Sequence, residues 1–582
     1  MTKLEEDYES LLDKYNFERP LEAGSINRII HVELENFLAD TNNPAIYCNG
    51  EHTQKLLSDF VFELKKVKVI IDNYADGKDS GYKIIKKEDI ATEKIDAIVV
   101  SSYGYMSQIV KELAEDYPDV KVLNIYEKLG EQGIVLHSDY YYGTHPYHNY
   151  HLLNQLQREL VNSDDKNEIY FKIINKYLHI KDFKTAIKYS REAFECTGQH
   201  RYEQMQADLE KLYSLELEYA ENIGQENVLM LCLDGLRYQD VSPVLLPEVA
   251  KCLSKDWMNY SNTYSYSTST YESLMPAYSE NTDMRTKYFD KNSIDGKDCR
   301  FLQKAFEQGR NVYFYTDGFH YVEHTDIKYS EAPETITQKF WDFIVDAQNE
   351  KNGLFYIHGM YETHFAFSNP YTTEPLLAEG TALMFDLLPV KGGKLRTDYV
   401  QQHDDGLRYV DDVIAPLLNR INCKAVFYAD HGNLLMDKDS TLSDIKKEYL
   451  QCGEEWLRIP FFVKSKENKA GVCDKLHSIM SINDAVISLL ENSEYKSADK
   501  TYIKIGRSQI YNPDFQKLYK LLGEEKRLQA FEGFIFPEGY KMVVYADGHS
   551  ELYDLKDDEL FDDKKIEELL ATVSKDITVK DA

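Results

Sequence analysis

Short apolar runs that alternate with amphipathic stretches constrain the fold of this chain more than any other feature. The alternation is present from Pro44 to Tyr126, and it resumes with the apolar run Val228 to Leu233 and continues to the end of the chain. Strand–helix alternation is typical of α/β domains with largely parallel sheets. A chain of 582 residues also exceeds what one hydrophobic core usually organises. We therefore predict the α/β class and more than one domain.

The segment between the two α/β regions has a different period. From Glu168 to Glu221 apolar residues recur at spacings of three and four, which predicts helices. Their pairing resembles tetratricopeptide-type hairpins, although no repeat of fixed period is present. We predict three domains: a Rossmann-like α/β domain with a leading helix at 1–150, a helical connector at 151–222, and a larger α/β domain at 223–582.

The first α/β region carries one glycine, Gly50, at a strand-turn-helix passage. A dinucleotide fingerprint needs three glycines there, so we expect a structural or acceptor-binding role and no bound dinucleotide cofactor. Near the end of this region His145, His148 and His151 lie in an aromatic stretch. Gly143 and Pro146 interrupt regular structure, so we expect a loop and no metal site.

The charge of the chain limits its partners. A formal net charge of −32 disfavours nucleic acid and anionic membrane surfaces. A phosphate substrate would need a local attraction, such as a divalent cation or a helix N-terminus. The acidic N-terminal stretch does not resemble a secretory signal, no apolar run approaches the ~20 residues of a membrane span, and the eight cysteines lack C-x-x-C spacing. We expect a cytoplasmic protein without a transmembrane segment.

Three passages carry residues suited to chemistry. Asp234 follows the apolar run Val228 to Leu233, where an α/β sheet gathers its functional groups, although an aspartate there is also a common turn former. The hydroxyl-rich passage from Tyr260 to Ser279 offers a Thr or Ser nucleophile, and the alternative is a solvated loop. Asp430 and His431 directly follow another apolar run, so they predict a metal site or a structural ion pair.

In the order LCLDG, NTYSYSTSTYESLMP, YIHGMYETHF, FYADHGN and LRIPFFV, these passages resemble the alkaline phosphatase superfamily, sulfatase-like branch, over roughly Asn227 to Asp563. The hydroxyl-rich passage is most similar to phosphoethanolamine transferases and lipoteichoic acid synthases. The first region resembles Rossmann-like domains that accompany sugar-modifying enzymes of bacterial surface polysaccharide pathways. The predicted fold is therefore an alkaline-phosphatase-like mixed sheet flanked by helices, preceded by a small Rossmann-like domain and a helical connector.

The resemblance implies a phosphothreonine intermediate at Thr270, with Thr268 in reserve. It implies that Asp234, Thr270, Asp430 and His431 share one divalent cation, Zn²⁺ or Mn²⁺ before Mg²⁺. It also implies that His364 binds a phosphoryl oxygen or protonates the leaving group.

His358 and Glu362 are candidates for part of a second metal site. The chain lacks the glutamate directly after Gly432 and the later histidine of two-metal members, so we do not expect a complete second site. It also lacks the C/S-x-P-x-R motif from which type I sulfatases make formylglycine, which disfavours sulfate-ester hydrolysis.

The expected function is transfer of a substituted phosphoryl group, such as phosphoethanolamine or phosphoglycerol, to a glycan hydroxyl in bacterial surface polysaccharide or capsule synthesis. The donor would be a phosphorylated small molecule or a nucleotide-activated compound. The alternatives are a soluble phosphodiesterase or phosphatase with the same nucleophile, and a catalytically silent scaffold.

Overall fold

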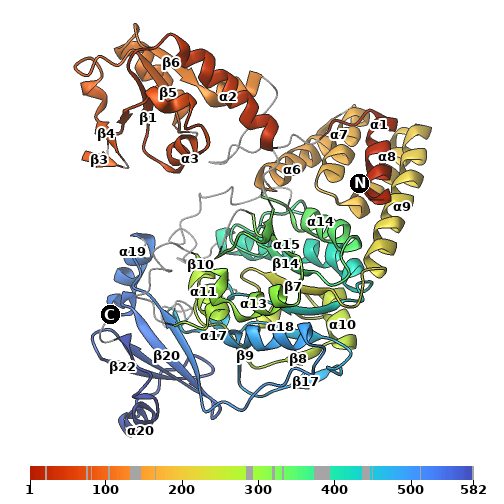
Figure 1. Ribbon diagram of the computed structural model, residues 1–582, viewed down its shortest axis with the longest axis vertical. Helices are drawn as coiled ribbons and strands as arrows, with labels where there is room; N and C mark the ends of the chain where they lie inside the picture. The colour runs from red at the N-terminus through yellow and green to blue at the C-terminus, as the bar shows by residue number, and fades with distance from the viewer. Residues whose placement is uncertain are drawn as a thin grey trace. The chain divides into compact units, whose positions relative to one another are not determined.

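The computed structural model divides into two compact units, Arg19–Asn149 and a larger unit of Met1–Glu18 with Tyr150–Ala582 (Figure 1). The predicted domain boundaries at 150 and 222 stay a prediction, and the structure groups the leading helix with the larger unit. The residues described are 1–19, 23–73, 77–79, 81–102, 105–131, 146–163, 165–282, 293–317, 321–330, 333–372, 394–435, 446–447, 450–511 and 513–579.

The small unit contains a six-stranded sheet in the order β3-β4-β2-β1-β5-β6. All neighbours pair in parallel except β3 and β4, and α2 and α4 contribute to separate apolar clusters with alternate residues of β1 and β5. Alternate residues of a strand lie on opposite faces, so both faces of the sheet are covered, as predicted for a Rossmann-like domain. The bounds are α2 Ala23–Ala39, β1 Pro44–Tyr47, α3 Glu51–Asp59, β2 Val69–Ile71, β3 Gly77–Asp79, β4 Tyr82–Ile85, β5 Ala97–Val100, α4 Met106–Asp116, β6 Lys121–Asn124 and α5 Ile125–Glu131.

A layer of helices begins the larger unit. The helices predicted between 168 and 221 are confirmed as α7 (Lys166–His179), α8 (Phe183–Thr197) and α9 (His200–Glu221). The leading helix α1 (Lys3–Tyr15) packs on α9, and its Tyr8 ring contacts Trp341 at a centroid distance of 5.5 Å.

The loop expected up to residue 151 is wrong from Pro146 onward. There α6 (Pro146–Asn162) begins with the proline as its first residue, a position where the missing N–H is not needed by the helix. His148 and His151 are therefore helical, and His145 lies outside the described residues.

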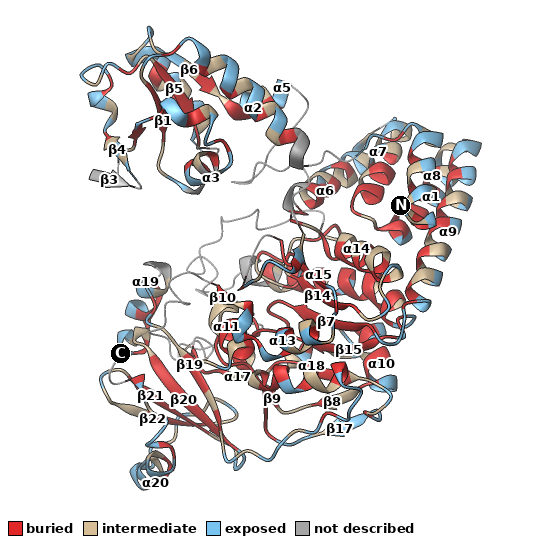
Figure 2. Cartoon of the chain, in the orientation of Figure 1, coloured by how far each residue is buried: buried red, intermediate tan, exposed pale blue. Residues whose placement is uncertain are grey.

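The central sheet of the larger unit is mixed, in the order β13-β11-β14-β7-β15-β16-β8-β17. Strands β14, β7 and β15 are neighbours and run in parallel. All six residues of β7 are buried, as expected for a strand covered on both faces (Figure 2). The bounds are β7 Val228–Leu233, β8 Met258–Tyr260, β11 Val312–Tyr315, β13 Ile327–Tyr329, β14 Leu354–Gly359, β15 Lys424–Tyr428, β16 Phe461–Lys464 and β17 Gly471–Cys473.

Helices cover both faces of this sheet (Figure 1). One group packs on α15, and the other packs around α18, which contacts β7 and β15. The first group is α10 Pro247–Asp256, α14 Ile336–Gln348 and α15 Lys394–Leu418, and the second is α11 Thr270–Ser279, α13 Arg300–Glu307 and α18 Ile482–Leu490. Two short parallel pairs complete the region, β9 Thr263–Tyr264 with β18 His477–Ser478 and β10 Ile294–Asp295 with β12 Val322–Glu323.

A second, antiparallel sheet follows near the C-terminus, in the order β19-β20-β21-β22. One face packs on α20, and the other shares an apolar cluster with Tyr264 and Trp456 of the preceding region. Strands β21 and β22 form the antiparallel hairpin that closes this sheet. The bounds are α17 Glu454–Leu457, β19 Ile503–Arg507, α19 Pro513–Leu522, β20 Phe531–Phe536, β21 Tyr540–Tyr545, β22 Ser550–Asp554 and α20 Asp563–Val573.

Within the described residues, no helix combines the length and the apolar character that crossing a bilayer requires. All eight cysteines are free thiols, and five of them are buried.

A buried carboxyl group makes the stability of the helical layer depend on pH. Glu216 of α9 is 3% exposed, and burial, together with the nearby Asp182 carboxylate, raises its pKa to about 8 while Lys181 opposes the rise. The folded chain therefore binds a proton that the unfolded chain has lost above its ordinary pKa of 4.5. Stability contributed by Glu216 is present in acid and is lost as the pH rises through 8.

We predict that Glu216→Gln, which keeps the neutral form at every pH, removes this loss. From pH 6 to pH 8 the wild type should lose about 2 kcal/mol of unfolding free energy relative to the variant. Urea denaturation of both proteins across this range measures the difference. Parallel stability curves would contradict the assignment.

Candidate metal centre

The ends of three neighbouring parallel strands bring polar side chains together. Asp234 directly follows β7, His358 is the fifth residue of β14, and Asp430 comes two residues after β15. Because the carboxyl ends of parallel strands meet at one edge, these side chains converge there. The Nε2 atom of His358 lies 3.2 Å from Oδ2 of Asp234. All three side chains are almost completely buried.

His431 and Thr270 complete the cluster. The Nε2 atom of His431 lies 3.6 Å from Oδ1 of Asp234 and 3.4 Å from Oδ2 of Asp430. The hydroxyl of Thr270 donates to Oδ2 of Asp234 at 3.2 Å and lies 3.4 Å from Nε2 of His431. The four side chains expected to share a cation thus lie together, although they are spread over 198 residues of sequence.

Thr270 is the first residue of α11, which places its hydroxyl at a helix N-terminus. The preceding Ser269 makes no side-chain capping bond, so the first turn of the helix is not closed by a side chain. The hydroxyl-rich loop is tied to the strand end, because Ser265 donates to the carbonyl oxygen of Asp430. The amides of such a helix start favour an anion.

The hydrogen bonds of the histidines orient their free nitrogens. Nδ1 of His431 lies 2.7 Å from the carbonyl oxygen of Gly432, and Nδ1 of His364 lies 2.8 Å from that of Phe365. A carbonyl only accepts, so each Nδ1 donates. In the neutral imidazole the lone pair is then on Nε2, which faces a carboxylate. Two electron-rich groups at such distances repel each other unless a proton or a cation lies between them.

Unsatisfied buried atoms show that these residues fit a divalent cation. Oδ1 of Asp234, Oδ2 of Asp430 and Nε2 of His358 are all buried and make no hydrogen bond. Two groups of ligand atoms lie within 4.8 Å of one another, Asp234 with His364 and His431, and Asp234 with His358 and Asp430. Carboxylate oxygens and imidazole nitrogens are ligands of Zn²⁺ and Mn²⁺. The two groups share Asp234.

The surroundings of Asp234 favour the ionised form of its carboxyl group. Burial by itself would raise the pKa of Asp234, but the surrounding His364, His358 and His431 imidazoles outweigh it and lower the pKa below its ordinary value. A charged, buried carboxylate of this kind requires cationic partners.

Comparison with protein families identifies the domain that holds this centre. A family model described as Sulfatase matches residues 252–492, a range that includes Thr270, His364, Asp430 and His431. These residues form a sulfatase-family domain. The alkaline phosphatase superfamily expected from the sequence is confirmed, and with it an enzyme class of metal-dependent hydrolases and phosphotransferases. A second family model, described as "C2185-like, N-terminal", matches residues 41–123.

Several solved structures are similar in fold to this chain. The phosphonate monoester hydrolase of Agrobacterium radiobacter is 12% identical, with 61% of this chain and 95% of that chain covered and a TM-score of 0.41. The C-terminal periplasmic domain of EcEptC from Escherichia coli is 13% identical, with coverages of 50% and 92% and a TM-score of 0.36. BT1596, a 2-O GAG sulfatase, is 14% identical, with coverages of 60% and 90% and a TM-score of 0.39. No curated protein matches the chain.

One asparagine that sequence reasoning missed connects three loops of the centre. Asn433 donates to the carbonyl oxygens of Gly235 and Thr363, both at 2.8 Å, and Thr363 in turn donates to the carbonyl oxygen of Asp234 at 2.7 Å. Gly235 has a φ of +72°, and a Cβ there would lie 2.5 Å from the Asn433 side chain. The position of Asn433 directly after Asp430-His431-Gly432 is the signal that could have revealed it.

Other residues considered from the sequence occupy different places. His364 borders the centre, with Nε2 3.9 Å from Oδ1 of Asp234 and a side chain that is 36% exposed. Thr268 donates to Gln451 at 3.2 Å, and no hydrogen bond links it to the acidic residues of the centre within the described chain. Glu362 accepts a bond from the amide of Ile336 at 3.1 Å, at the start of α14, and belongs to neither ligand group among the described residues.

His358 lies closer to Asp234 than the sequence suggested. It was expected only as part of a second metal site, whereas its Nε2 atom faces Asp234 directly. Its Nδ1 atom lies 2.8 Å from the hydroxyl of Tyr321, which fixes the ring. A histidine inside a buried apolar strand gives no sequence signal that separates a ligand from a core residue.

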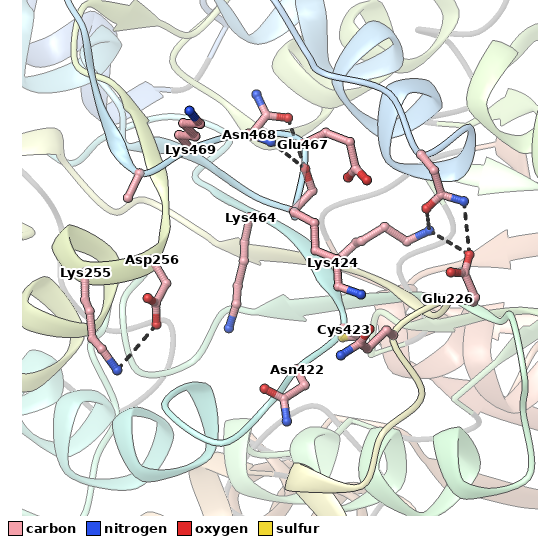
Figure 3. Close-up of a pocket in the computed structure, with 15 residues that line it drawn as sticks. Glu226, Lys255, Asp256, Asn422, Cys423, Lys424, Lys464, Glu467, Asn468 and Lys469 are labelled. Carbon is pink, nitrogen blue, oxygen red and sulfur yellow. Dashed lines mark hydrogen bonds and ion pairs between the residues drawn. The ribbon is translucent and has the colours of Figure 1, made fainter.

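A cavity of about 610 Å³ lies at the other edge of the sheet (Figure 3). Its lining includes Lys424, the first residue of β15, and Glu226, which precedes β7. These positions mark the amino ends of the strands whose carboxyl ends form the centre. Lys424 pairs with Glu226 at 3.2 Å and with Asn492 at 2.8 Å. The cavity is therefore separate from the chemistry of the sulfatase-family domain.

We predict that the metal-free chain binds one Zn²⁺ or Mn²⁺ and that binding raises its melting temperature. The ion would give the buried carboxylate oxygens a partner of opposite charge, and a ligand that binds only the folded chain stabilises it. Asp430→Asn should weaken the affinity about 100-fold or more, because it removes the charge of a ligand. Calorimetric titration measures both effects. Asp256→Asn, the same change at a residue that lines the opposite cavity, should bind the ion as the wild type does. Equal affinity of Asp430→Asn and wild type would contradict the assignment.

Proposed function

We propose that the sulfatase-family domain transfers a substituted phosphoryl group to a glycan hydroxyl through a phosphothreonine at Thr270. The observation that carries the proposal is the position of the Thr270 hydroxyl at the start of α11, hydrogen-bonded to Asp234 and beside His431. The group moved would resemble phosphoethanolamine or phosphoglycerol. The proposal extends to one divalent cation, Zn²⁺ or Mn²⁺, held by Asp234, Thr270, Asp430 and His431.

In the first half of the reaction the Thr270 oxygen attacks phosphorus in line with the leaving group. The Thr270 hydroxyl, which donates to Oδ2 of Asp234 at 3.2 Å, loses its proton to solvent as the O–P bond forms at its oxygen. The amides at the start of α11 face the phosphoryl oxygens. A divalent cation bound here would supply positive charge that lowers the pKa of the hydroxyl and neutralises the phosphoryl group.

The leaving group needs a proton when it is an alcohol. His364 is partly exposed beside the centre, its Nδ1 atom is fixed on a carbonyl, and its Nε2 atom is open to the site. In its protonated form it gives the Nε2 proton to the departing oxygen as the P–O bond breaks. The neutral imidazole then accepts a proton from the incoming acceptor.

In the second half the acceptor hydroxyl attacks the phosphothreonine. A new O–P bond forms, the bond to Thr270 breaks, and the Thr270 oxygen takes up a proton from solvent. Water in place of the glycan gives hydrolysis, so a phosphodiesterase or phosphatase with the same nucleophile is the alternative. Leaving-group release that rises with a glycan acceptor separates transfer from hydrolysis.

Phosphorus is favoured over sulfur as the reacting centre. The chain carries a threonine at the start of α11 and has no C/S-x-P-x-R motif that would supply formylglycine. A cytoplasmic location, a nucleotide-activated donor and a role in capsule synthesis stay predictions. The third reading, a silent scaffold, requires that Thr270 be chemically inert.

Replacement of the nucleophile tests the proposal directly. Thr270→Ala should lower turnover of bis(p-nitrophenyl) phosphate by at least about 10³-fold, because no other hydroxyl donates to the carboxylate of Asp234 among the described residues. Mass spectrometry of the acid-quenched wild type should find the phosphoryl adduct on the peptide that contains Thr270. Thr268→Ala should still form that adduct. Full turnover by Thr270→Ala would exclude the mechanism and the phosphothreonine.

His364 is tested by leaving groups of different basicity. In His364→Gln, release of p-nitrophenolate should fall by less than about 10-fold, because this anion leaves without a proton. Release of an aliphatic alcohol from the matching diester should fall about 10²- to 10⁴-fold. His200→Gln, at an exposed position on α9, is the control for the substitution itself. Equal losses for both substrates would show that His364 is not the acid.

A further inference from the structure

An arginine from the C-terminal sheet contacts the nucleophile loop. Nη1 of Arg507, the last residue of β19, donates to the hydroxyl of Thr268. The backbone of β19 is bonded to the same loop, because the amide of Gly506 donates to the carbonyl oxygen of Tyr266 at 2.8 Å. On the next residue, Ser508 donates to the Glu272 carboxylate of α11. The end of β19 thus follows the loop that leads to Thr270.

The orientation of Arg507 is set by the strand. Ile503 and Ile505 belong to the apolar cluster that includes Tyr264 of the preceding region. Side chains alternate along a strand, so Arg507 lies on the same face as these two residues. Lys504 lies on the opposite face, where it pairs with Glu532 at 2.6 Å. Arg507 is therefore directed at the core of the sulfatase-family domain.

Arg507 has no carboxylate partner among the described residues. Among the residues the structure describes, no carboxylate lies within 4.0 Å of its guanidinium, although the sequence holds 99 acidic and 67 basic residues. Its Nε atom is buried and makes no hydrogen bond within the described chain. By contrast, Arg527 of the same region pairs with Glu551 and Glu524. A partly desolvated guanidinium without a counter-charge is unfavourable unless an anion binds to it.

The position of this cation relative to the nucleophile limits what it can bind. Thr268 and Thr270 are two residues apart, so their Cα atoms are separated by at most about 7 Å. A group attached to the phosphorus that Thr270 attacks is therefore within reach of Arg507. The rigid fork of a guanidinium matches a phosphate better than an alcohol. In a chain of net charge −32, a second anionic group also needs a local attraction.

We infer that Arg507 binds the neighbouring phosphate of a phosphoanhydride donor and so selects a nucleoside diphosphate ester over a simple phosphodiester. This inference rests on the proposed function. The bond from the Thr270 oxygen to phosphorus forms, the anhydride P–O bond breaks, and its electron pair stays on the leaving phosphate. A phosphate leaves without a proton at neutral pH, so Arg507 balances its charge and His364 is needed only when the acceptor attacks.

The selectivity between two substrates tests the inference. For each variant, kcat/KM is measured for CDP-glycerol and for bis(p-nitrophenyl) phosphate. In Arg507→Gln the ratio of the two values should fall about 10- to 100-fold, because a charge-assisted contact to the second phosphate is lost. Arg507→Lys should keep part of the ratio, since it keeps the charge without the fork. Lys504→Gln, the same charge loss on the opposite face of β19, should leave the ratio unchanged.

If Arg507→Gln lowers kcat/KM equally for both substrates, the inference is overturned and the proposed function stays intact. That result is expected if Arg507 only supports the nucleophile loop. If the wild type turns over neither substrate, the proposed function fails, and binding decides the inference separately. In metal-loaded Thr270→Ala, calorimetry should show CDP binding tighter than CMP, with the difference lost on adding Arg507→Gln. A difference that persists would overturn the inference.

Discussion

Two carboxylates buried at one sheet edge are the constraint on which the rest of the larger unit depends. Asp234 and Asp430 stand at the ends of neighbouring parallel strands, each with a buried oxygen that makes no hydrogen bond. Burial of such groups is costly unless imidazoles and a cation lie beside them. His358, His431 and the Thr270 hydroxyl occupy those places, and the hydrogen bonds of Asn433 hold the three supporting loops in register.

The nucleophile loop is held from two sides. On one side Ser265 donates to the carbonyl oxygen of Asp430, and on the other the end of β19 bonds to Tyr266, Thr268 and Glu272. The C-terminal sheet is thus part of the wall around the centre, fixed there by the apolar cluster that it shares with Tyr264 and Trp456.

The spacing of apolar residues predicted the fold correctly wherever one face of a helix or strand is apolar. The strand at Val228–Leu233 and the helices between 166 and 221 follow directly from spacing, because burial imposes a period of two or of 3.6 on a sequence. The prediction of a loop at Pro146 was wrong. Pro146 begins α6 although it interrupts a helix elsewhere, since its missing N–H is harmless only in the first turn. The leading helix packs on α9, and its own sequence does not specify that partner.

The sequence by itself determined the chemistry available to this protein: acidic and imidazole groups at strand ends, a threonine in a hydroxyl-rich loop, and no formylglycine motif. Those groups can be recognised in the sequence because each interrupts an apolar or regular pattern. The tertiary structure decided which of them meet. His358 turned toward Asp234 from inside a buried strand, Thr268 turned to Gln451, and Arg507 reached the loop from 239 residues away in sequence. Such contacts depend on strand order and packing between distant segments, which local spacing does not encode.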